Sequence, residues 1–138
     1  MRHAILHIGL GKTGTSSLQE FLQLNRAEFL AGERLWIPEF MGRGSQWPLA
    51  VLAYSPDRCD DLTIPLGDAE SRHCKMEEIR RQIVASVALH SECKYCFSSE
   101  HLSSRLTAPQ DLDRLRSFLD GLFDEVTVIV YLREPIRL

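Results

Sequence analysis

The sequence predicts an α/β fold in which helices flank a parallel β-sheet on both faces. Short apolar segments that are typical of buried strands, at residues 4–8, 34–40, 94–98 and 125–132, alternate with longer amphipathic patterns that are typical of helices. Strands that are separated by helices usually pair in parallel, with the connecting helices covering the sheet. A length of 138 residues fits one domain, residues 1–138.

The first strand leads directly into a helix. Apolar side chains after Thr15 recur at helical spacing, which predicts a helix from Thr15 to Ala31 with Gly32 as its stop signal. The next apolar segment predicts a second strand, which Pro38 ends. His3 and His7 lie on the first strand, where a histidine usually has a structural role.

The middle of the chain predicts one short helix and one irregular segment. Ser45 is placed to cap a helix from Gln46 to Tyr54, in which Trp47 and Leu52 pack inward. Residues 55–67 contain two prolines and several carboxylates, so we expect a surface segment near an acceptor site. Repulsion would disfavour a polyanionic glycan at the carboxylates of this segment, which are Asp57, Asp60 and Asp61.

The second half of the chain predicts two amphipathic helices and a strand. A long helix begins at Asp68 or Ser71 and continues to His90, with one apolar face formed by Met76, Ile79, Ile83, Val87 and Leu89. Residues 109–123 form another helix, with Pro109 in its first turn and an inward face of Leu112, Leu115, Leu119 and Leu122. Residues 125–132 are apolar enough for a strand that is buried on both faces.

Composition narrows the class of protein. The chain is 44% apolar and 25% charged, and its net charge of −3 gives no reason to expect nucleic-acid binding. No apolar segment approaches a membrane span. The apolar segment at the start is too short for a signal peptide, and Lys12 interrupts it, so we expect a cytoplasmic protein. Cys93 and Cys96 have the spacing of a redox or metal pair, but they begin a strand, so we interpret them as isolated thiols.

A glycine-rich loop joins the first strand to the first helix. Its glycines allow successive backbone N–H groups to point at an anion, and the helix start adds further N–H groups and the positive end of its dipole. The sequence therefore predicts a phosphate-binding loop. The common nucleotide-binding loop carries its lysine directly after the last glycine, whereas here Thr15 follows Gly14 and the lysine is Lys12.

The string Lys12-Thr-Gly-Thr-Ser-Ser-Leu-Gln19 resembles the 5′-phosphosulfate-binding loop of the sulfotransferases that use 3′-phosphoadenosine 5′-phosphosulfate (PAPS). The resemblance implies a P-loop NTPase-like three-layer sandwich and transfer of a sulfuryl group from PAPS to a hydroxyl or amine acceptor, without a metal. It also implies that Lys12 is catalytic, because it would contact the oxygen between sulfur and phosphorus and stabilise the leaving group. The implied ligands of the 5′-phosphate and its surroundings are Gly11, Lys12, Thr13, Gly14, Thr15, Ser16 and Ser17.

The 3′-phosphate site of this family is a strand that ends in arginine, followed by a serine at a helix start. Residues 128–137 look like the first half of that site, with Arg133 as the phosphate ligand and Arg137 close behind it. The expected serine would lie beyond Leu138, as would the region that completes the adenine and acceptor pockets. We therefore expect the chain to be the N-terminal part of a longer protein, so that its domain is truncated at the C-terminus.

The family uses a histidine or a glutamate as the base that deprotonates the acceptor. Glu100 and His101 follow the third strand, whose carboxyl end should face the donor. Glu100 is the first choice because a carboxylate beside Lys12 can be held ionised, and His101 is the alternative because histidine ordinarily titrates near neutral pH. Side-chain alternation suggests that one of the two points into the cleft. A structural role stays open, in which Ser98 or Ser99 caps the next turn and Glu100 stabilises its start.

Two other functions stay open. A P-loop nucleotide kinase or NTPase would carry its lysine after Gly14 and an aspartate at the end of a buried strand, whereas Arg133 follows Leu132. A non-catalytic nucleotide-binding domain would keep the loop without the chemistry. No pattern in the sequence distinguishes a small-molecule acceptor from a carbohydrate or specifies an oligomeric state.

Overall fold

The computed structural model describes residues 1–9, 15–42 and 44–132 of the chain. Their four strands form one parallel sheet in the order β2-β3-β1-β4. The strands are β1 (His3–His7), β2 (Leu35–Trp36), β3 (Lys94–Ser98) and β4 (Glu125–Ile129). Each connection between them carries at least one helix, which is why the strands are parallel, as the alternating pattern predicted.

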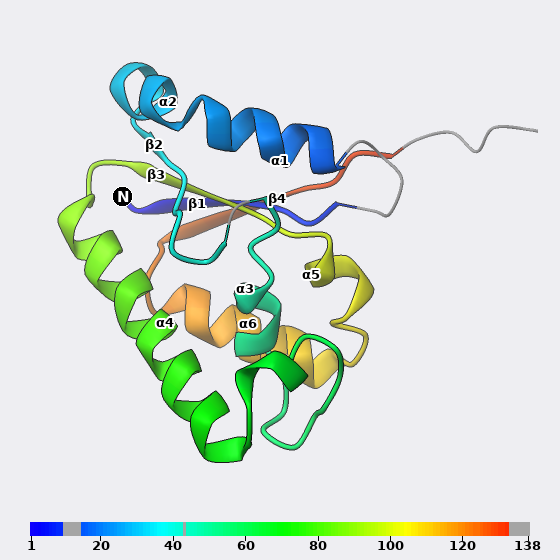
Figure 1. Ribbon diagram of the computed structural model, residues 1–138. Helices are drawn as coiled ribbons and strands as arrows, with labels where there is room; N and C mark the ends of the chain where they lie inside the picture. Colours follow the sequence, from blue (N-terminus) through cyan, green and yellow to red (C-terminus); the bar gives the residue numbers. More distant parts are fainter. Residues whose placement is uncertain (10–14, 43, 133–138) are drawn as a thin grey trace, which may run out of the picture.

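Helices lie on both faces of the sheet (Figure 1). One face is covered by α1 (Thr15–Leu24) and α2 (Arg26–Glu33), and the other by α3 (Pro48–Leu52), α4 (Ala69–Leu89) and α6 (Pro109–Asp120). The short helix α5 (His101–Ser104) follows β3, and a single 3₁₀ turn spans Ile64–Leu66. The α/β class and the flanked parallel sheet are therefore confirmed. No helix in the described ranges has both the length and the apolar composition needed to cross a bilayer.

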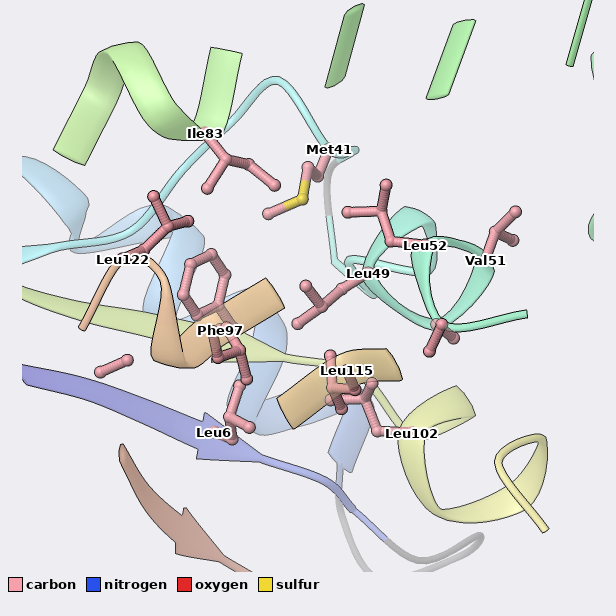
Figure 2. Packing of buried hydrophobic residues seen from close by; sticks show 14 of the residues in the cluster. Leu6, Met41, Leu49, Val51, Leu52, Ile83, Phe97, Leu102, Leu115 and Leu122 are labelled. Atoms are coloured by element: carbon pink, nitrogen blue, oxygen red, sulfur yellow. The ribbon is translucent and has the colours of Figure 1, made fainter. Parts of the chain in front are cut away.

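The main core lies between the sheet and the group of α3, α4 and α6. Leu6 of β1 and Phe97 of β3 project from neighbouring strands into this layer and meet Leu49, Ile83 and Leu115 from the three helices (Figure 2). These side chains are at most 8% exposed. Each buried aliphatic or aromatic side chain contributes about 1.5–3 kcal/mol, so this layer fixes how the helices sit on the sheet.

The first helical region is two helices rather than the one that the sequence predicted. The break is at Asn25, whose side-chain amide donates to the Phe21 carbonyl at 2.8 Å and so competes with the regular helical pattern. The second helix passes through Gly32 and is followed by Arg34, which has the left-handed conformation (φ +52°) and donates its N–H to the Phe29 carbonyl. Gly32 is therefore not the stop signal.

The predicted starts of α3 and α4 have different outcomes. Of the two candidate starts for α4, Asp68 and Ser71, Asp68 is the N-cap, because its carboxylate accepts from the Ser71 N–H at 2.8 Å. Ser45 does not cap α3, which begins later, at Pro48; the Ser45 hydroxyl instead lies 3.1 Å from the Ser99 hydroxyl. Leu52 is buried, as expected.

The last strand is not buried on both faces, as the sequence had predicted. It lies at the edge of the sheet and pairs only with β1 among the described strands, and its Val128 side chain is 57% exposed. The predicted inward face of α6 is also corrected, because Leu112 is 53% exposed at a groove between α6 and β4. Leu89 is exposed as well, because it ends α4 beyond the part that packs on the core.

Candidate functional site

The carboxyl ends of β1 and β3 meet at one edge of the sheet, where α1 also begins. The register pairs His7 with Ser98, the last residues of the two strands, and the Ser99 N–H continues the ladder to the His7 carbonyl at 3.0 Å. The Ser103 hydroxyl of α5 donates to the carbonyl of Gly9, which has a φ of +44° that favours glycine. The segment after β3 therefore anchors the residue from which the glycine-rich loop departs.

The predicted loop is described only in part. Gly11, Lys12, Thr13, Gly14 and Arg133 lie outside the described residues, as does Arg137. Thr15 begins α1, so Thr15, Ser16 and Ser17 occupy its first turn, where backbone N–H groups have no partner within the helix. Ser16 and Ser17 are exposed, so their hydroxyls are accessible to a ligand at the helix start.

Glu100 lies beside α1, although the two are far apart in the sequence. Gln19, buried on the sheet-facing side of α1, donates from its amide to Glu100 Oε2 at 2.9 Å. Burial by itself would raise the Glu100 pKa, but the hydrogen bond from Gln19, with smaller contributions from its own backbone and from the Ser45 hydroxyl, lowers it overall. The Glu100 side chain is 35% exposed, so an ionised carboxylate at this edge is open to solvent.

The Glu100 and His101 side chains lie together rather than on opposite sides. His101 Nε2 is 3.7 Å from Glu100 Oε1, while His101 Nδ1 is buried without a hydrogen-bond partner among the described residues. Alternation does not apply to these residues, because Glu100 already has a right-handed helical backbone (φ −66°, ψ −20°) at the start of α5. The structure therefore keeps both residues as candidates for the base.

The sequence left open a purely structural role for Ser98, Ser99 and Glu100 at the start of α5, and only Ser99 has that role. Ser99 Oγ accepts the His101 N–H at 3.3 Å, so Ser99 does cap the turn. The Ser98 hydroxyl is directed elsewhere, 2.8 Å from His7 Nδ1. The Glu100 side chain turns to Gln19 instead of to the helix that it precedes.

Gln46 braces the end of β3. Its backbone N–H donates to the Ser98 carbonyl at 2.9 Å, its side-chain oxygen accepts the Ser98 N–H at 3.0 Å, and its amide donates to the Pro38 carbonyl at 3.1 Å. The side chain is 1% exposed and all of its roles are satisfied, which holds the residues before Glu100 in one geometry.

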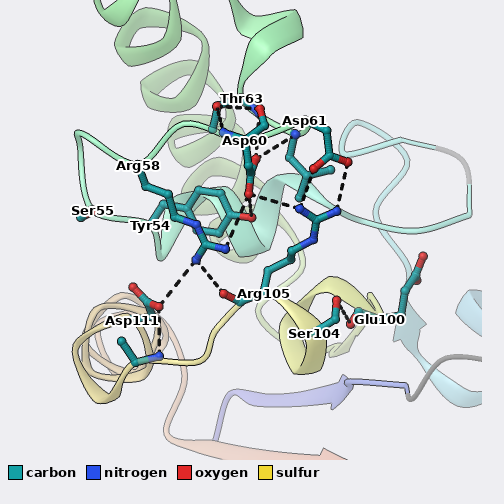
Figure 3. A network of polar contacts seen from close by, with 12 residues as sticks. Tyr54, Ser55, Arg58, Asp60, Asp61, Thr63, Glu100, Ser104, Arg105 and Asp111 are labelled. Atoms are coloured by element: carbon teal, nitrogen blue, oxygen red, sulfur yellow. Dashed lines mark hydrogen bonds and ion pairs between the residues drawn. The ribbon is translucent and has the colours of Figure 1, made fainter.

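A network of ion pairs joins the segment 55–67 to the end of α5 (Figure 3). Arg105 binds both carboxylate oxygens of Asp61, at 2.6 and 3.0 Å, and Arg58 donates to the Arg105 carbonyl at 2.6 Å. Asp60 accepts from the Tyr54 hydroxyl at 2.8 Å and lies 3.4 Å from Arg105. Since Asp60 and Asp61 are paired with arginines, the predicted repulsion of a polyanionic glycan from this segment is largely neutralised.

Sequence reasoning missed two residues that shape this site, Gln19 and Gln46. Both are buried polar residues, at 4% and 1% exposure. The available signal was position: Gln19 ends the sulfotransferase-like string and lies in the second turn of α1, next to the predicted phosphate-binding residues. A buried amide needs partners, which marks such positions as parts of a polar network.

The remaining predicted features have structural explanations. His3 Nε2 lies 2.8 Å from the Thr127 hydroxyl, a pairing between strands. Cys96 is buried in β3, which raises its pKa to about 11, and Cys93 forms no disulfide with it. Within the described ranges, no three histidine, cysteine or carboxylate side chains cluster as a metal site.

Comparisons of the chain with protein-family models, with curated proteins and with solved structures found no match.

Proposed function

We propose that the protein is a sulfotransferase that moves a sulfuryl group from PAPS to a hydroxyl or amine acceptor. The observation that carries the proposal is the placement of the sulfotransferase-like string. Its loop leaves β1 of a parallel sheet, its Thr15–Gln19 half forms the first turns of α1, and Gln19 brings Glu100 to that helix. We also propose that the flanked sheet belongs to the P-loop NTPase-like three-layer class.

Sulfuryl transfer requires the protein to position the reactants and to stabilise developing negative charge, and it requires no covalent intermediate with the protein. The start of α1 would bind the 5′-phosphate through backbone N–H groups and the Ser16 and Ser17 hydroxyls. By resemblance, Lys12 would stabilise charge on the oxygen that leaves sulfur, and Arg133 would bind the 3′-phosphate. As the new bond between the acceptor atom and sulfur forms and the old sulfur–oxygen bond breaks, Glu100 would take the acceptor's proton.

Glu100 is favoured over His101 as the base because of its environment. Its lowered pKa keeps it ionised at neutral pH, and its second oxygen is not occupied by Gln19. His101 Nε2 lies 3.7 Å from Glu100 Oε1, which is too far for a hydrogen bond, so this oxygen can still accept a proton. A replacement of Glu100 by glutamine should therefore abolish transfer while leaving donor binding intact.

The proposal is tested by binding of the desulfated product, 3′-phosphoadenosine 5′-phosphate, to the full 138-residue chain. At about a hundred times its dissociation constant, a ligand stabilises the folded protein by about 2.7 kcal/mol, which a thermal-shift experiment resolves. Lys12→Ala and Arg133→Ala should each weaken this stabilisation. The matched control is Lys94→Ala, because Lys94 is exposed at the opposite, amino-terminal end of β3.

Three outcomes separate the candidate functions. Stabilisation by the bisphosphate that both site variants reduce and the control retains supports the sulfotransferase. Stabilisation by ATP–Mg²⁺ alone would replace it with a kinase or NTPase. Binding of the bisphosphate without sulfuryl transfer to any hydroxyl or amine acceptor would leave a non-catalytic nucleotide-binding domain.

A further inference from the structure

His7 has one ring nitrogen that is bonded and one that is not. It is the last residue of β1 and is 3% exposed. Its Nδ1 lies 2.8 Å from the Ser98 hydroxyl, whereas its buried Nε2 has no hydrogen-bond partner among the described residues. A buried polar atom without a partner costs about 1–3 kcal/mol, so such atoms are rare in folded proteins and need an explanation.

The orphaned nitrogen lies on the side of the sheet where α1 begins. Ala4 and Leu6 of β1 point into the core on the opposite face, so alternation along the strand places His3, Ile5 and His7 on the face that α1 covers. His3, on the same face of the same strand, is paired with Thr127 at 2.8 Å. The missing partner is thus a property of the carboxyl end of β1 and not of histidines on this face.

The hydrogen bond to Ser98 also sets where Nε2 points. The two nitrogens of an imidazole face nearly opposite directions, so a ring whose Nδ1 meets β3 directs Nε2 away from β3. On that side, where β4 pairs with β1, the Tyr131 ring lies 5.4 Å from the His7 ring and is tilted by 58° against it. Nε2 is therefore buried on the β4 side of β1, at the carboxyl end of the strand and on the face of the sheet that α1 covers.

The surroundings keep His7 neutral and able to donate from this nitrogen. Burial lowers the His7 pKa, and the carboxylate of Glu100 only partly opposes that effect. A neutral imidazole carries one N–H. When the Ser98 hydroxyl donates to Nδ1, the hydrogen stays on Nε2, which is the tautomer that an anion beside Nε2 selects.

We propose that His7 is a ligand-binding residue of the site, whose Nε2–H donates a hydrogen bond to a phosphate or sulfate oxygen of the molecule bound at the start of α1. This inference rests on the proposed function for the identity of that molecule, but its chemistry requires only an oxyanion. Ser98 is a positioning residue, because its hydroxyl lies 2.8 Å from Nδ1 and so fixes the orientation of the ring. Helix N–H groups and His7 then approach the same oxyanion from two directions.

The test uses ¹⁵N-histidine-labelled protein and spectra that report the protonation of each ring nitrogen. The wild-type chain is titrated with 3′-phosphoadenosine 5′-phosphate and, separately, with inorganic pyrophosphate. We expect the His7 Nε2 signal to shift with each ligand that binds while it keeps its proton, and the His3 signals to stay in place. Binding affinity should fall about tenfold in His7→Phe, which keeps a ring but has no donor, the loss expected for one hydrogen bond to a charged group.

Two further variants separate ligand contact from fold. His3→Phe is the matched control, because it makes the same change on the same face of β1 and should bind as wild type does. Ser98→Ala keeps the ring but removes the partner of Nδ1, so the ring loses its fixed orientation. This variant should weaken binding less than His7→Phe does and should move the Nδ1 signal. The melting temperature of each variant identifies losses that come from unfolding.

Each outcome decides the proposal. Binding of the bisphosphate with unchanged His7 signals, and with equal affinity in His7→Phe, would overturn the role of His7 and leave the sulfotransferase standing. A His7 response to pyrophosphate without binding of the bisphosphate would support the role of His7 and count against PAPS as the donor. Binding of neither ligand would overturn both.

Discussion

The hydrogen bond between Gln19 and Glu100 is the contact through which α1 and the end of β3 form one site, and its strength can be measured. A double-mutant cycle compares Gln19→Ala, Glu100→Ala and the double variant, so that the changes in buried area cancel and only the coupling between the two side chains remains. The geometry that is tested is one amide donor at 2.9 Å from a carboxylate oxygen.

The expected coupling follows from burial. A hydrogen bond to a charged group contributes about 1.5–3 kcal/mol when it is well buried. The Glu100 side chain is 35% exposed, so solvent screening reduces this to about 1 kcal/mol at pH 7. Because the Glu100 pKa is lowered from its ordinary 4.5, the coupling is complete above that pH and is lost as the pH falls through the lower, folded-state value.

The assay is urea unfolding of the four proteins at several pH values between 7 and 3. A matched control cycle uses Gln82 and Glu78, an exposed pair at 3.1 Å within α4, for which about 0.3 kcal/mol is expected. The reasoning fails if the Gln19–Glu100 coupling is no larger than that of the control pair, or if it is the same at every pH.

Three other predictions concern the rest of the molecule. Asp60→Ala should lower the free energy of unfolding, measured by urea titration, by about 3 kcal/mol, because Tyr54, Arg58 and Arg105 each lose a partner. A loss within about 0.5 kcal/mol, as for a surface substitution, would contradict this. Because burial lowers the His7 pKa from 6.5, the contribution of neutral His7 to stability is complete above pH 6.5 and is lost as the pH falls through the folded-state pKa. His7→Gln should flatten the plot of unfolding free energy against pH below 6.5, and an unchanged slope would refute this prediction. Iodoacetamide at pH 8 should label exposed Cys59 and Cys74 well before Cys96, whose thiol is buried with a pKa near 11, and peptide mass spectrometry showing early labelling of Cys96 would count against this.

Local patterns in the sequence determined the elements and much of their order. The apolar run before Gly9 and the hydroxyl-rich start at Thr15 correctly predicted a strand and a helix on either side of the loop. Asp68 marked the start of α4, because a side-chain cap acts on a neighbour three residues away. Such signals depend on contacts within one turn or one strand, so they can be found without knowing the fold.

Tertiary structure decided which of these surfaces are covered and which side chains meet. The strand at residues 125–129 is as apolar as a central strand, yet its place at the sheet edge leaves Val128 exposed, because strand order depends on pairing between distant segments. The pairs His7–Ser98 and Gln19–Glu100 join residues 91 and 81 positions apart. Periodicity shows which side chains share a face, but only the packing of whole elements brings two such faces together.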